Sequence, residues 1–276
     1  MGPRRPSLLY VPRAERVTTP APTAARRWAP LARWAADLLA PPACPGCRRH
    51  LAVPGPGLGL CLGCRSRVVA HDGRRCRGCA RALAGPTRPA DGRCGDCRRR
   101  PPPWSSLFCL WDYAPPVDRV LHVFKFERLE GLGGCFAREG WDRWGEELAA
   151  ADGVVAMPLP WTRRLLRGFN QAEAIARPLA RRLGRPLLDP LARSPSPPMS
   201  RMSAAARRRL ARRTLHLRAG VALPRSVLLV DDVVTTGATL RAATRLLWSA
   251  GAREVLALAP FWTPAPGGLR ARPENP

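Results

Sequence analysis

The sequence predicts an α/β protein with a parallel sheet, preceded by a small cysteine-rich module. Short apolar runs with the length and β-branched content of buried strands alternate with segments of helical periodicity in the second half of the chain. That alternation is typical of a parallel sheet covered by helices. Eight of the ten cysteines form Cys-x-x-Cys pairs before the first of these strands. With 276 residues, 46% of them hydrophobic, the chain can bury a proper core.

The N-terminal part is predicted to hold little regular structure before the cysteines. Residues 1–27 are rich in proline and arginine without hydrophobic periodicity, so we expect them to be disordered. They also lack the apolar core of a secretory signal. Residues 28–39 place apolar side chains at helical spacing up to Pro41 and Pro42, which predicts a short amphipathic helix. We assign residues 28–100 to this helix together with the cysteine-rich module.

The cysteine pairs have the spacing of metal-binding knuckles. Thirteen residues separate the first two pairs and fourteen the last two, so each half can complete a tetrahedral four-thiolate site with zinc-ribbon spacing. The expected ligands are Cys44, Cys47, Cys61, Cys64, Cys76, Cys79, Cys94 and Cys97. We predict a double zinc ribbon with two structural zinc ions, and an iron–sulfur cluster is the alternative. Four regular pairs without a secretory signal disfavour disulfides and a redox dithiol.

The two remaining cysteines and the rest of the chain follow a different pattern. Cys109 and Cys135 lie outside the knuckles and are expected to be small buried hydrophobic residues. Residues 104–262 are predicted to form the α/β domain. We expect strands at residues 107–113, 154–157, 227–230 and 255–259, and helices at residues 117–124, 172–183 and 240–250. The tail of residues 263–276 is rich in proline and glycine and is expected to be loose.

The most informative segment lies where the strand at residues 227–230 ends. Two carboxylates, Asp231 and Asp232, follow the strand, and a small loop leads into the next helix. The loop consists of Thr235, Thr236, Gly237, Ala238 and Thr239. A helix N-terminus presents backbone N–H groups to an anion and glycine lets the backbone approach closely, so the loop suits a phosphate group. An ionised aspartate only accepts hydrogen bonds, which suits vicinal ribose hydroxyls.

Two alternatives compete with a ribose-phosphate site at this segment. A P-loop is excluded because the loop lacks the Gly-Lys-Ser/Thr ending. An ordinary buried strand with acids at its end, common in doubly wound sheets, is the simpler alternative. We favour the ribose-phosphate site because the acids, the loop and the helix all match it together.

Four motifs occur in an order that resembles the ComF/GntX family of phosphoribosyltransferase-like proteins. They are Phe124-Lys125-Phe126, Pro158-Leu159-Pro160, Arg167-Gly168-Phe169-Asn170-Gln171 and the acidic pair with its loop, after a ribbon-like N-terminus. The resemblance covers roughly residues 28–260. It implies a type I phosphoribosyltransferase-like parallel sheet that binds 5-phosphoribosyl-1-pyrophosphate (PRPP). In that case Asp231 and Asp232 hold the ribose hydroxyls and residues 235–239 hold the 5′-phosphate.

The resemblance implies a cytoplasmic protein that binds PRPP or a ribonucleotide and is linked to competence and DNA uptake. If it is a phosphoribosyltransferase, Mg²⁺ would bridge pyrophosphate and ribose oxygens as pyrophosphate leaves, and no residue identifies the acceptor. The sequence leaves open an alternative from another class, a single-stranded nucleic-acid-binding module with a non-catalytic, regulatory PRPP site. Trp104, Trp111 or the exposed fraction of the other tryptophans could then supply stacking platforms.

Charge points to anionic partners. The formal net charge is +26, from 46 basic residues of which only Lys125 is lysine. Eight thiolates with two zinc ions lower it to about +22, which still favours PRPP, pyrophosphate, nucleic acid or an acidic partner. The arginine-rich residues 163–213 could form a positive lip with residues 194–210 as a mobile lid, or simply a solvated face. No apolar run approaches the roughly 20 residues that membrane insertion needs.

Overall fold

A computed structural model of the chain describes residues 43–51, 58–68, 70–71, 74–83, 89–127, 129–196 and 203–263. These residues belong to one compact unit that begins at Ala43. The expected lead-in of residues 1–27, the short helix at residues 28–39 and the tail after residue 263 lie outside the described residues.

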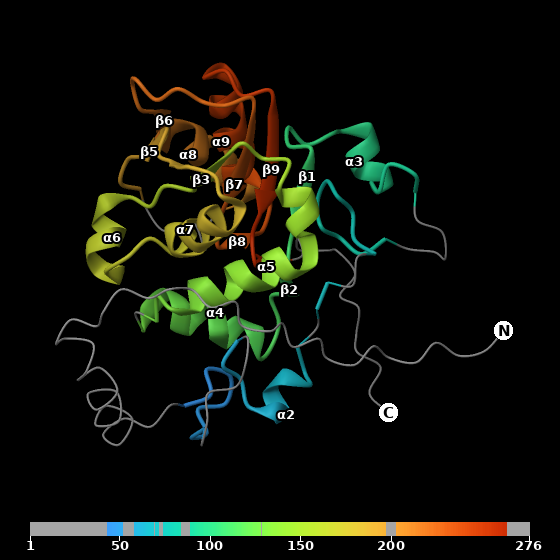
Figure 1. Cartoon of the computed structure of the whole chain (residues 1–276), viewed down its shortest axis with the longest axis vertical. Coiled ribbons are helices and arrows are strands. Elements are labelled where there is room, and N and C mark those ends of the chain that lie inside the picture. The colour runs from blue at the N-terminus through green and yellow to red at the C-terminus, as the bar shows by residue number, and fades with distance from the viewer. Residues whose placement is uncertain are drawn as a thin grey trace, which may run out of the picture. The chain divides into compact units, whose positions relative to one another are not determined.

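Five parallel strands of the described chain form the central sheet, which confirms the predicted α/β class (Figure 1). Their spatial order is β1-β9-β7-β3-β4. The strands span Ser106–Phe108 (β1), Glu254–Leu258 (β9), Ser226–Val230 (β7), Gly153–Ala156 (β3) and Leu187–Leu188 (β4). Every residue of β7 is buried, as expected for an apolar, β-branched strand in a parallel sheet with both faces covered.

Three of these strands break and then resume as a second, smaller parallel sheet of order β2-β10-β8. The added strands are Trp111–Asp112 (β2), Phe261–Trp262 (β10) and Val233–Val234 (β8). The single strand predicted over residues 107–113 is therefore wrong, because it is broken at Cys109–Leu110. The N–H groups of Leu110 and Trp111 both donate to the carbonyl oxygen of Pro260, at 3.0 and 2.9 Å, and sharing one acceptor in this way bends a strand as a bulge does.

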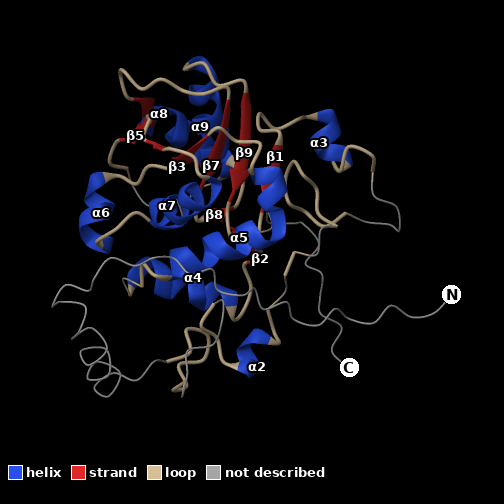
Figure 2. Cartoon of the chain, in the orientation of Figure 1, coloured by secondary structure: helices blue, strands red, loops and turns tan. Residues whose placement is uncertain are grey.

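Helices cover both faces of the sheet, because alternate strand residues point to opposite sides (Figure 2). Leu228 and Val230 pack with the helices of one face, and Val227 and Leu229 with those of the other. The first face carries α4 (Val117–Phe126), α5 (Leu132–Leu148) and α7 (Gln171–Leu183), and the second carries α8 (Ala204–Thr214) and α9 (Ala238–Ser249). The predicted helices at residues 117–124, 172–183 and 240–250 are thereby confirmed.

Several elements were not predicted. Helix α5 contains four glycines, and α6 (Trp161–Arg167) has no buried residue. Strands β5 (Leu191–Arg193) and β6 (Leu215–Leu217) pair antiparallel on either side of α8 in the sequence. Residues 194–210 were considered as a mobile lid. Most of those that the structure describes belong to the beginning of helix α8.

Candidate functional site

The chain reverses direction across the sheet between β3 and β7. From β7 it runs through α9 to β9 on one side, and from β3 through α6 and α7 to β4 on the other. Helices α7 and α9 lie on opposite faces. In open α/β sheets the crevice for ligands lies at such a switch point, beyond the carboxyl ends of the strands. The acidic pair follows β7 at this position, and the Pro-Leu-Pro turn follows β3.

The acidic pair occupies the break between β7 and β8. The backbone N–H of Asp231 donates to the carbonyl oxygen of Leu258 at 2.9 Å, which fixes the first acid against β9. The N–H of Asp232 donates to Oδ1 of Asp231 at 2.8 Å. Oδ2 of Asp232 lies 3.0 Å from Nζ of Lys125, and the two side chains are only 14% and 18% exposed. Removing one partner of so sheltered an ion pair leaves the other charge poorly compensated.

The carboxyl group of Asp231 has an unusual titration. Burial raises its pKa to about 7, and the neighbouring charge of Asp232 adds to the effect. The hydrogen bond from the N–H of Asp232 and the positive charges of Arg193 and Lys125 oppose the shift. Close to neutral pH the group is therefore poised between its protonated and ionised forms, and a perturbed acid in a crevice is a mark of a functional site.

Arginines from two other elements face the acids. Burial lowers the pKa of Arg193, on β5, and the charges of Asp231 and Asp232 oppose that shift. Burial also lowers the pKa of Arg167, on α6, against the charge of Asp232. Nη1 of Arg167 donates to Oε1 of Gln171 at 3.0 Å, and its guanidinium lies 5.4 Å from the ring centroid of Phe126. The site thus combines two carboxylates with cations from α4, α6 and β5.

The phosphate-type loop begins directly after β8. Gly237 has φ +67° and is the N-cap of α9, a left-handed conformation that glycine adopts without strain. A Cβ atom at this position would lie 3.0 Å from Cη2 of Trp104, so the close approach also needs glycine. Thr236 and Thr239 are partly buried and Thr235 is exposed. The structure therefore places the acids and the loop at the end of one strand, as the sequence indicated.

The Arg-Gly-Phe-Asn-Gln motif has a clear local role. Gly168, with φ +83°, ends α6. Oδ1 of Asn170 accepts from the N–H of Ala172 at 3.1 Å, which makes this residue the N-cap of α7. Nδ2 of Asn170 donates to the carbonyl oxygen of Met157 at 3.0 Å. This bond ties the start of α7 to the end of β3 and so holds Arg167 beside the acids.

The cations of the site could not be identified from the sequence pattern. Lys125 lies far from Asp232 in the chain, and its motif does not reveal the pairing. One signal was available, since Lys125 is the only lysine among 46 basic residues. The ammonium group of lysine is a compact point charge, which suits the ion pair that Lys125 makes with one oxygen of Asp232. No comparable signal separates Arg193 from the surrounding arginines.

The eight knuckle cysteines form two groups in the described chain, and the ligand atoms of each lie within 4.8 Å of one another. Each group has a β-bridge around its first knuckle, Ala43 with His50 and Arg75 with Ala82. Backbone N–H groups point at the sulfurs, from Cys61 to Cys44 at 3.3 Å and from Cys94 to Cys76 at 3.2 Å.

One thiol in each group favours the thiolate form, because backbone N–H donors lower the pKa of Cys44 and of Cys76, whereas burial raises the pKa of Cys64 and Cys97. The side chain of Cys79 lowers the pKa of Cys76 to about 4 despite its burial, and backbone N–H donors reinforce the effect. Thiolates are the form that binds metal. Four sulfurs within tetrahedral reach fit a structural zinc ion in each ribbon.

The other two cysteines behave differently from each other. Cys109 is buried, 2% exposed, as expected, and burial raises its pKa. Cys135 is only partly buried and packs at the margin of the core.

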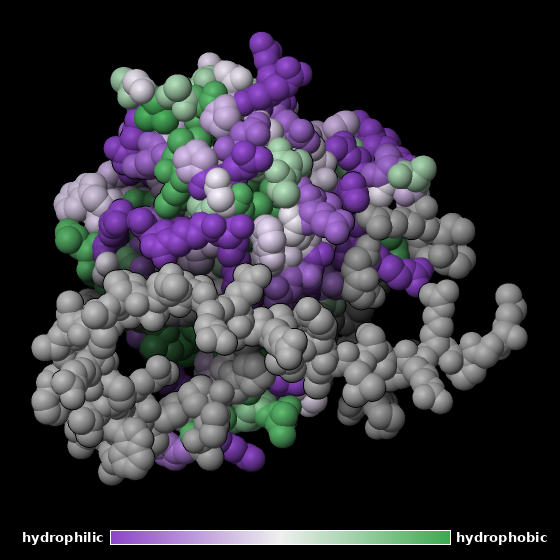
Figure 3. All heavy atoms as spheres, viewed as in Figure 1, coloured by the Kyte–Doolittle hydropathy of each residue, from purple (hydrophilic) through white to green (hydrophobic). Residues whose placement is uncertain are grey.

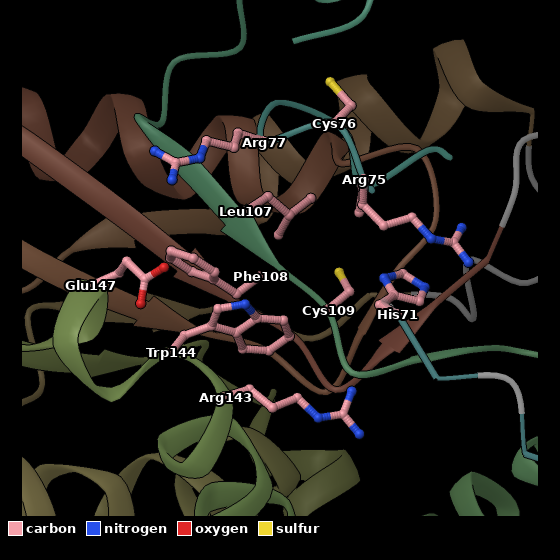
Figure 4. Close-up of a pocket in the computed structure, with 11 residues that line it drawn as sticks. His71, Arg75, Cys76, Arg77, Leu107, Phe108, Cys109, Arg143, Trp144 and Glu147 are labelled. Carbon is pink, nitrogen blue, oxygen red and sulfur yellow. The ribbon is translucent and has the colours of Figure 1, made fainter. Parts of the chain in front are cut away.

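A separate cavity of about 210 Å³ lies among the second ribbon, β1 and α5 (Figure 4). Three of its polar side chains, those of His71, Arg75 and Arg143, have hydrogen-bond partners. Asp112 binds His71 at 2.7 Å and Arg75 at 2.9 Å, and Arg143 donates to the carbonyl oxygen of Leu110 at 3.1 Å. The cavity contains neither acid of the candidate site. Within the described ranges, no helix combines the length and apolar character needed to cross a membrane.

Two parts of the chain match known protein families. Residues 35–98 match the family model of a double zinc ribbon domain, and residues 171–269 match that of a phosphoribosyl transferase domain. The DNA utilization protein YhgH of Salmonella typhimurium is 34% identical over 232 residues, which cover 79% of this chain and 96% of that protein. Competence protein F of Haemophilus influenzae is 26% identical over 223 residues, covering 77% and 93%.

Among solved structures, an adenine phosphoribosyltransferase aligns with a TM-score of 0.32 and 18% identity, over 50% of this chain and 82% of that one. The family assignment rests on the two domain matches and the nearly full-length relatives. The protein belongs to the ComF/GntX family, in which a double zinc ribbon is joined to a phosphoribosyltransferase domain.

Proposed function

We propose that the protein binds PRPP or a ribonucleotide at the carboxyl ends of β3 and β7. Asp231 and Asp232 accept hydrogen bonds from the ribose hydroxyls, and the loop of residues 235–239 holds the 5′-phosphate. One observation carries the proposal. A sheltered acidic pair and a glycine-capped helix start lie at the two ends of one short strand, at the switch point of the sheet.

The surrounding charges fit the rest of PRPP. Lys125, Arg167 and Arg193 bring positive charge to the acids from three separate elements. Mg²⁺ with pyrophosphate would add both a cation for the carboxylates and anions for the arginines, so the complex is closer to neutral than either part alone. If the site turns over, pyrophosphate leaves ribose C1 and an acceptor nucleophile takes its place.

Calorimetric titration of the zinc-loaded protein with Mg²⁺ and PRPP tests this proposal. Asp231→Asn and Asp232→Asn should each weaken binding about tenfold to a hundredfold, because each exchanges a charged acceptor for a neutral amide. Asp189→Asn is the control, since Asp189 is 75% exposed and pairs with Arg218. Wild-type protein that binds neither PRPP nor any ribonucleotide would exclude the proposal.

A second candidate is single-stranded nucleic-acid binding regulated by the PRPP site. Trp104 and Trp111 cannot supply the stacking platforms, because both are 3% exposed. Helix α6 instead exposes Trp161 at 63%, together with two leucines that contribute to a green patch at the left edge of Figure 3. Exposed arginines follow on α6 and α8 at Arg164, Arg208, Arg209, Arg212 and Arg213. The relatives named for DNA utilization and competence agree with this function.

Fluorescence anisotropy with a labelled single-stranded oligonucleotide tests the second candidate. Affinity should fall steeply between low and moderate salt, since phosphate contacts release counterions. Trp161→Ala should weaken binding by roughly 1–3 kcal/mol. Trp248→Ala, which removes a 43% exposed tryptophan from α9, should have little effect. Equal losses in both variants would contradict a platform on α6.

A further inference from the structure

One buried tryptophan joins the second zinc ribbon to the phosphate-type loop. Trp104 is 3% exposed. The outer edge of its indole meets Gly237, where a Cβ atom would come within 3.0 Å of Cη2. Its Nε1 donates to the carbonyl oxygen of Gly78 at 2.8 Å, and Gly78 lies between the metal ligands Cys76 and Cys79. A single side chain therefore contacts both the knuckle and the loop.

Gly78, which accepts the hydrogen bond from Trp104, is tightly packed against the ligand sulfurs of the second ribbon. The N–H of Gly78 points at the sulfur of Cys76 at 3.3 Å, and a Cβ atom on Gly78 would lie 2.8 Å from the sulfur of Cys97. A four-thiolate zinc ion would fix these sulfurs relative to one another, and with them the carbonyl group that Trp104 binds. Losing the ion would release the acceptor and the sulfurs around it together.

The loop end is equally constrained. The guanidinium of Arg241, on α9, lies 5.2 Å from the ring centroid of Trp104, so the indole contacts the helix that begins at Gly237. A backbone hydrogen bond also joins the second ribbon to the central sheet, because the N–H of Leu107 on β1 donates to the carbonyl oxygen of Arg77 at 2.7 Å. The contacts of the first ribbon run to α4 instead, where Arg119 donates to the carbonyl oxygen of Gly46 at 2.9 Å and Glu127 pairs with Arg48.

We propose that Trp104 is a positioning residue that couples metal occupancy of the second ribbon to the geometry of the loop at residues 235–239. If the loop holds a 5′-phosphate as proposed above, metal occupancy of the second ribbon controls the affinity for that phosphate. This consequence rests on the proposed function. The first ribbon stabilises α4 and has no such effect on the loop. The two ribbons, alike in their ligands, thus serve different parts of the domain.

Two pairs of variants isolate the coupling. Cys79→Ser and Cys47→Ser each remove the second ligand of a first knuckle, and both cysteines are partly buried, but they belong to different ribbons. Trp104→Phe and Trp262→Phe each remove an indole that donates at 2.8 Å to a carbonyl of the same knuckle, Gly78 and Cys79 respectively. The contact with Gly237 is made by Trp104, and the Trp262 variant therefore controls for general weakening of the ribbon.

The first measurement is amide hydrogen exchange of the full chain without ligand. Trp104→Phe and Cys79→Ser should speed exchange at residues 235–240 about tenfold, the loss expected when one hydrogen bond and its packing are removed. Cys47→Ser and Trp262→Phe should leave these amides as in the wild type. Unchanged exchange in Trp104→Phe, or an equal response to Cys47→Ser, would overturn the coupling.

The second measurement is calorimetry with ribose 5-phosphate and, separately, with magnesium pyrophosphate. Trp104→Phe should weaken ribose 5-phosphate binding about tenfold and leave pyrophosphate binding unchanged, because the cations beside the acids, Lys125, Arg167 and Arg193, lie on α4, α6 and β5. Equal loss of both ligands would show a general structural defect and overturn the positioning role. Loop exchange that responds as expected in a protein that binds neither ribose 5-phosphate, PRPP nor any ribonucleotide would support the coupling and exclude the proposed function.

Discussion

At the scale of single residues, Asp231 decides how the site responds to pH. An ionised carboxylate is the form that accepts ribose hydroxyls, yet burial and Asp232 favour the protonated form up to about pH 7. Ligand binding therefore has to supply the positive charge or hydrogen bonds that favour ionisation. Lys125 and Arg193 supply part of that charge in the free protein.

The same shift predicts how stability depends on pH. The folded pKa of Asp231, about 7, lies above its unfolded value of about 3.9, so between these values the folded state binds the proton more tightly. The contribution of the protonated group is fully present below the unfolded value and is lost as the pH rises through 7. From pH 5.5 to pH 8 the wild type should therefore lose about 1–3 kcal/mol more of its free energy of unfolding than Asp231→Asn does, because the variant has no carboxyl group at this position. Urea unfolding at the two pH values measures this, and a constant difference would contradict the raised pKa.

The residues of the site were predictable only where they lie close together in the sequence. Asp231, Asp232 and the loop follow one strand, so strand, acids and helix start are visible in a single stretch. Lys125 and Arg193 reach the acids through the sheet order and the β5–β6 pairing, which the local pattern does not contain. The stacking role considered for Trp104 failed for a related reason, since its burial depends on a ribbon more than 20 residues away.

At the scale of elements, the strongly periodic segments were predicted and the irregular ones were not. Helices α7 and α9 carry apolar residues at regular spacing, and a glycine with positive φ follows the end of each, Gly184 directly after α7 and Gly251 just past the C-cap of α9. Helix α5 was missed because its glycines lower helix propensity. Helix α8 was missed because its surface arginines hide a narrow apolar stripe that includes Ala211.

The glycines of α5 have different roles, which gives a matched prediction. A Cβ atom at Gly133 would lie 2.5 Å from the backbone oxygen of Ala174 on α7, whereas at Gly134 it would meet nothing within 4 Å. Gly133→Ala should destabilise the protein by about 1–3 kcal/mol, because the backbones of two packed helices must separate. Gly134→Ala should stabilise it by roughly 0.5–1 kcal/mol through helix propensity. Thermal unfolding of the pair measures the contrast, and two changes of the same sign would contradict the close packing of α5 and α7.

At the scale of the whole molecule, the ribbons are part of the domain core. Cys44 and Cys64 of the first ribbon pack in one hydrophobic cluster, and Ala80 of the second ribbon packs in the other. The sequence predicted both ribbons from spacing alone, because metal ligands must be close in space and knuckles make them close in sequence. Their contacts with opposite faces of the sheet could not be predicted, since these depend on the fold of the domain.

Metal analysis tests whether both ribbons bind zinc. Protein purified without chelator should contain two zinc ions per chain, and Cys79→Ser should retain about one while losing stability, because metal binding contributes to folding. Iron with visible absorption, or disulfides in place of metal, would contradict the assignment. Cys109→Ala is the control, because Cys109 belongs to neither group of ligands and should leave the zinc content at two.

Asp231, Asp232 and the loop of residues 235–239 together form the ribose-phosphate site that we propose. The most direct test is a crystal structure of the zinc-loaded protein soaked with Mg²⁺ and PRPP. Difference density should place the ribose 2′- and 3′-hydroxyls within hydrogen-bonding distance of the two carboxylates, with the 5′-phosphate against the backbone N–H groups at the start of α9. Ligand density elsewhere, such as in the cavity shown in Figure 4 or along the arginines of α8, with none at the end of β7, would contradict it.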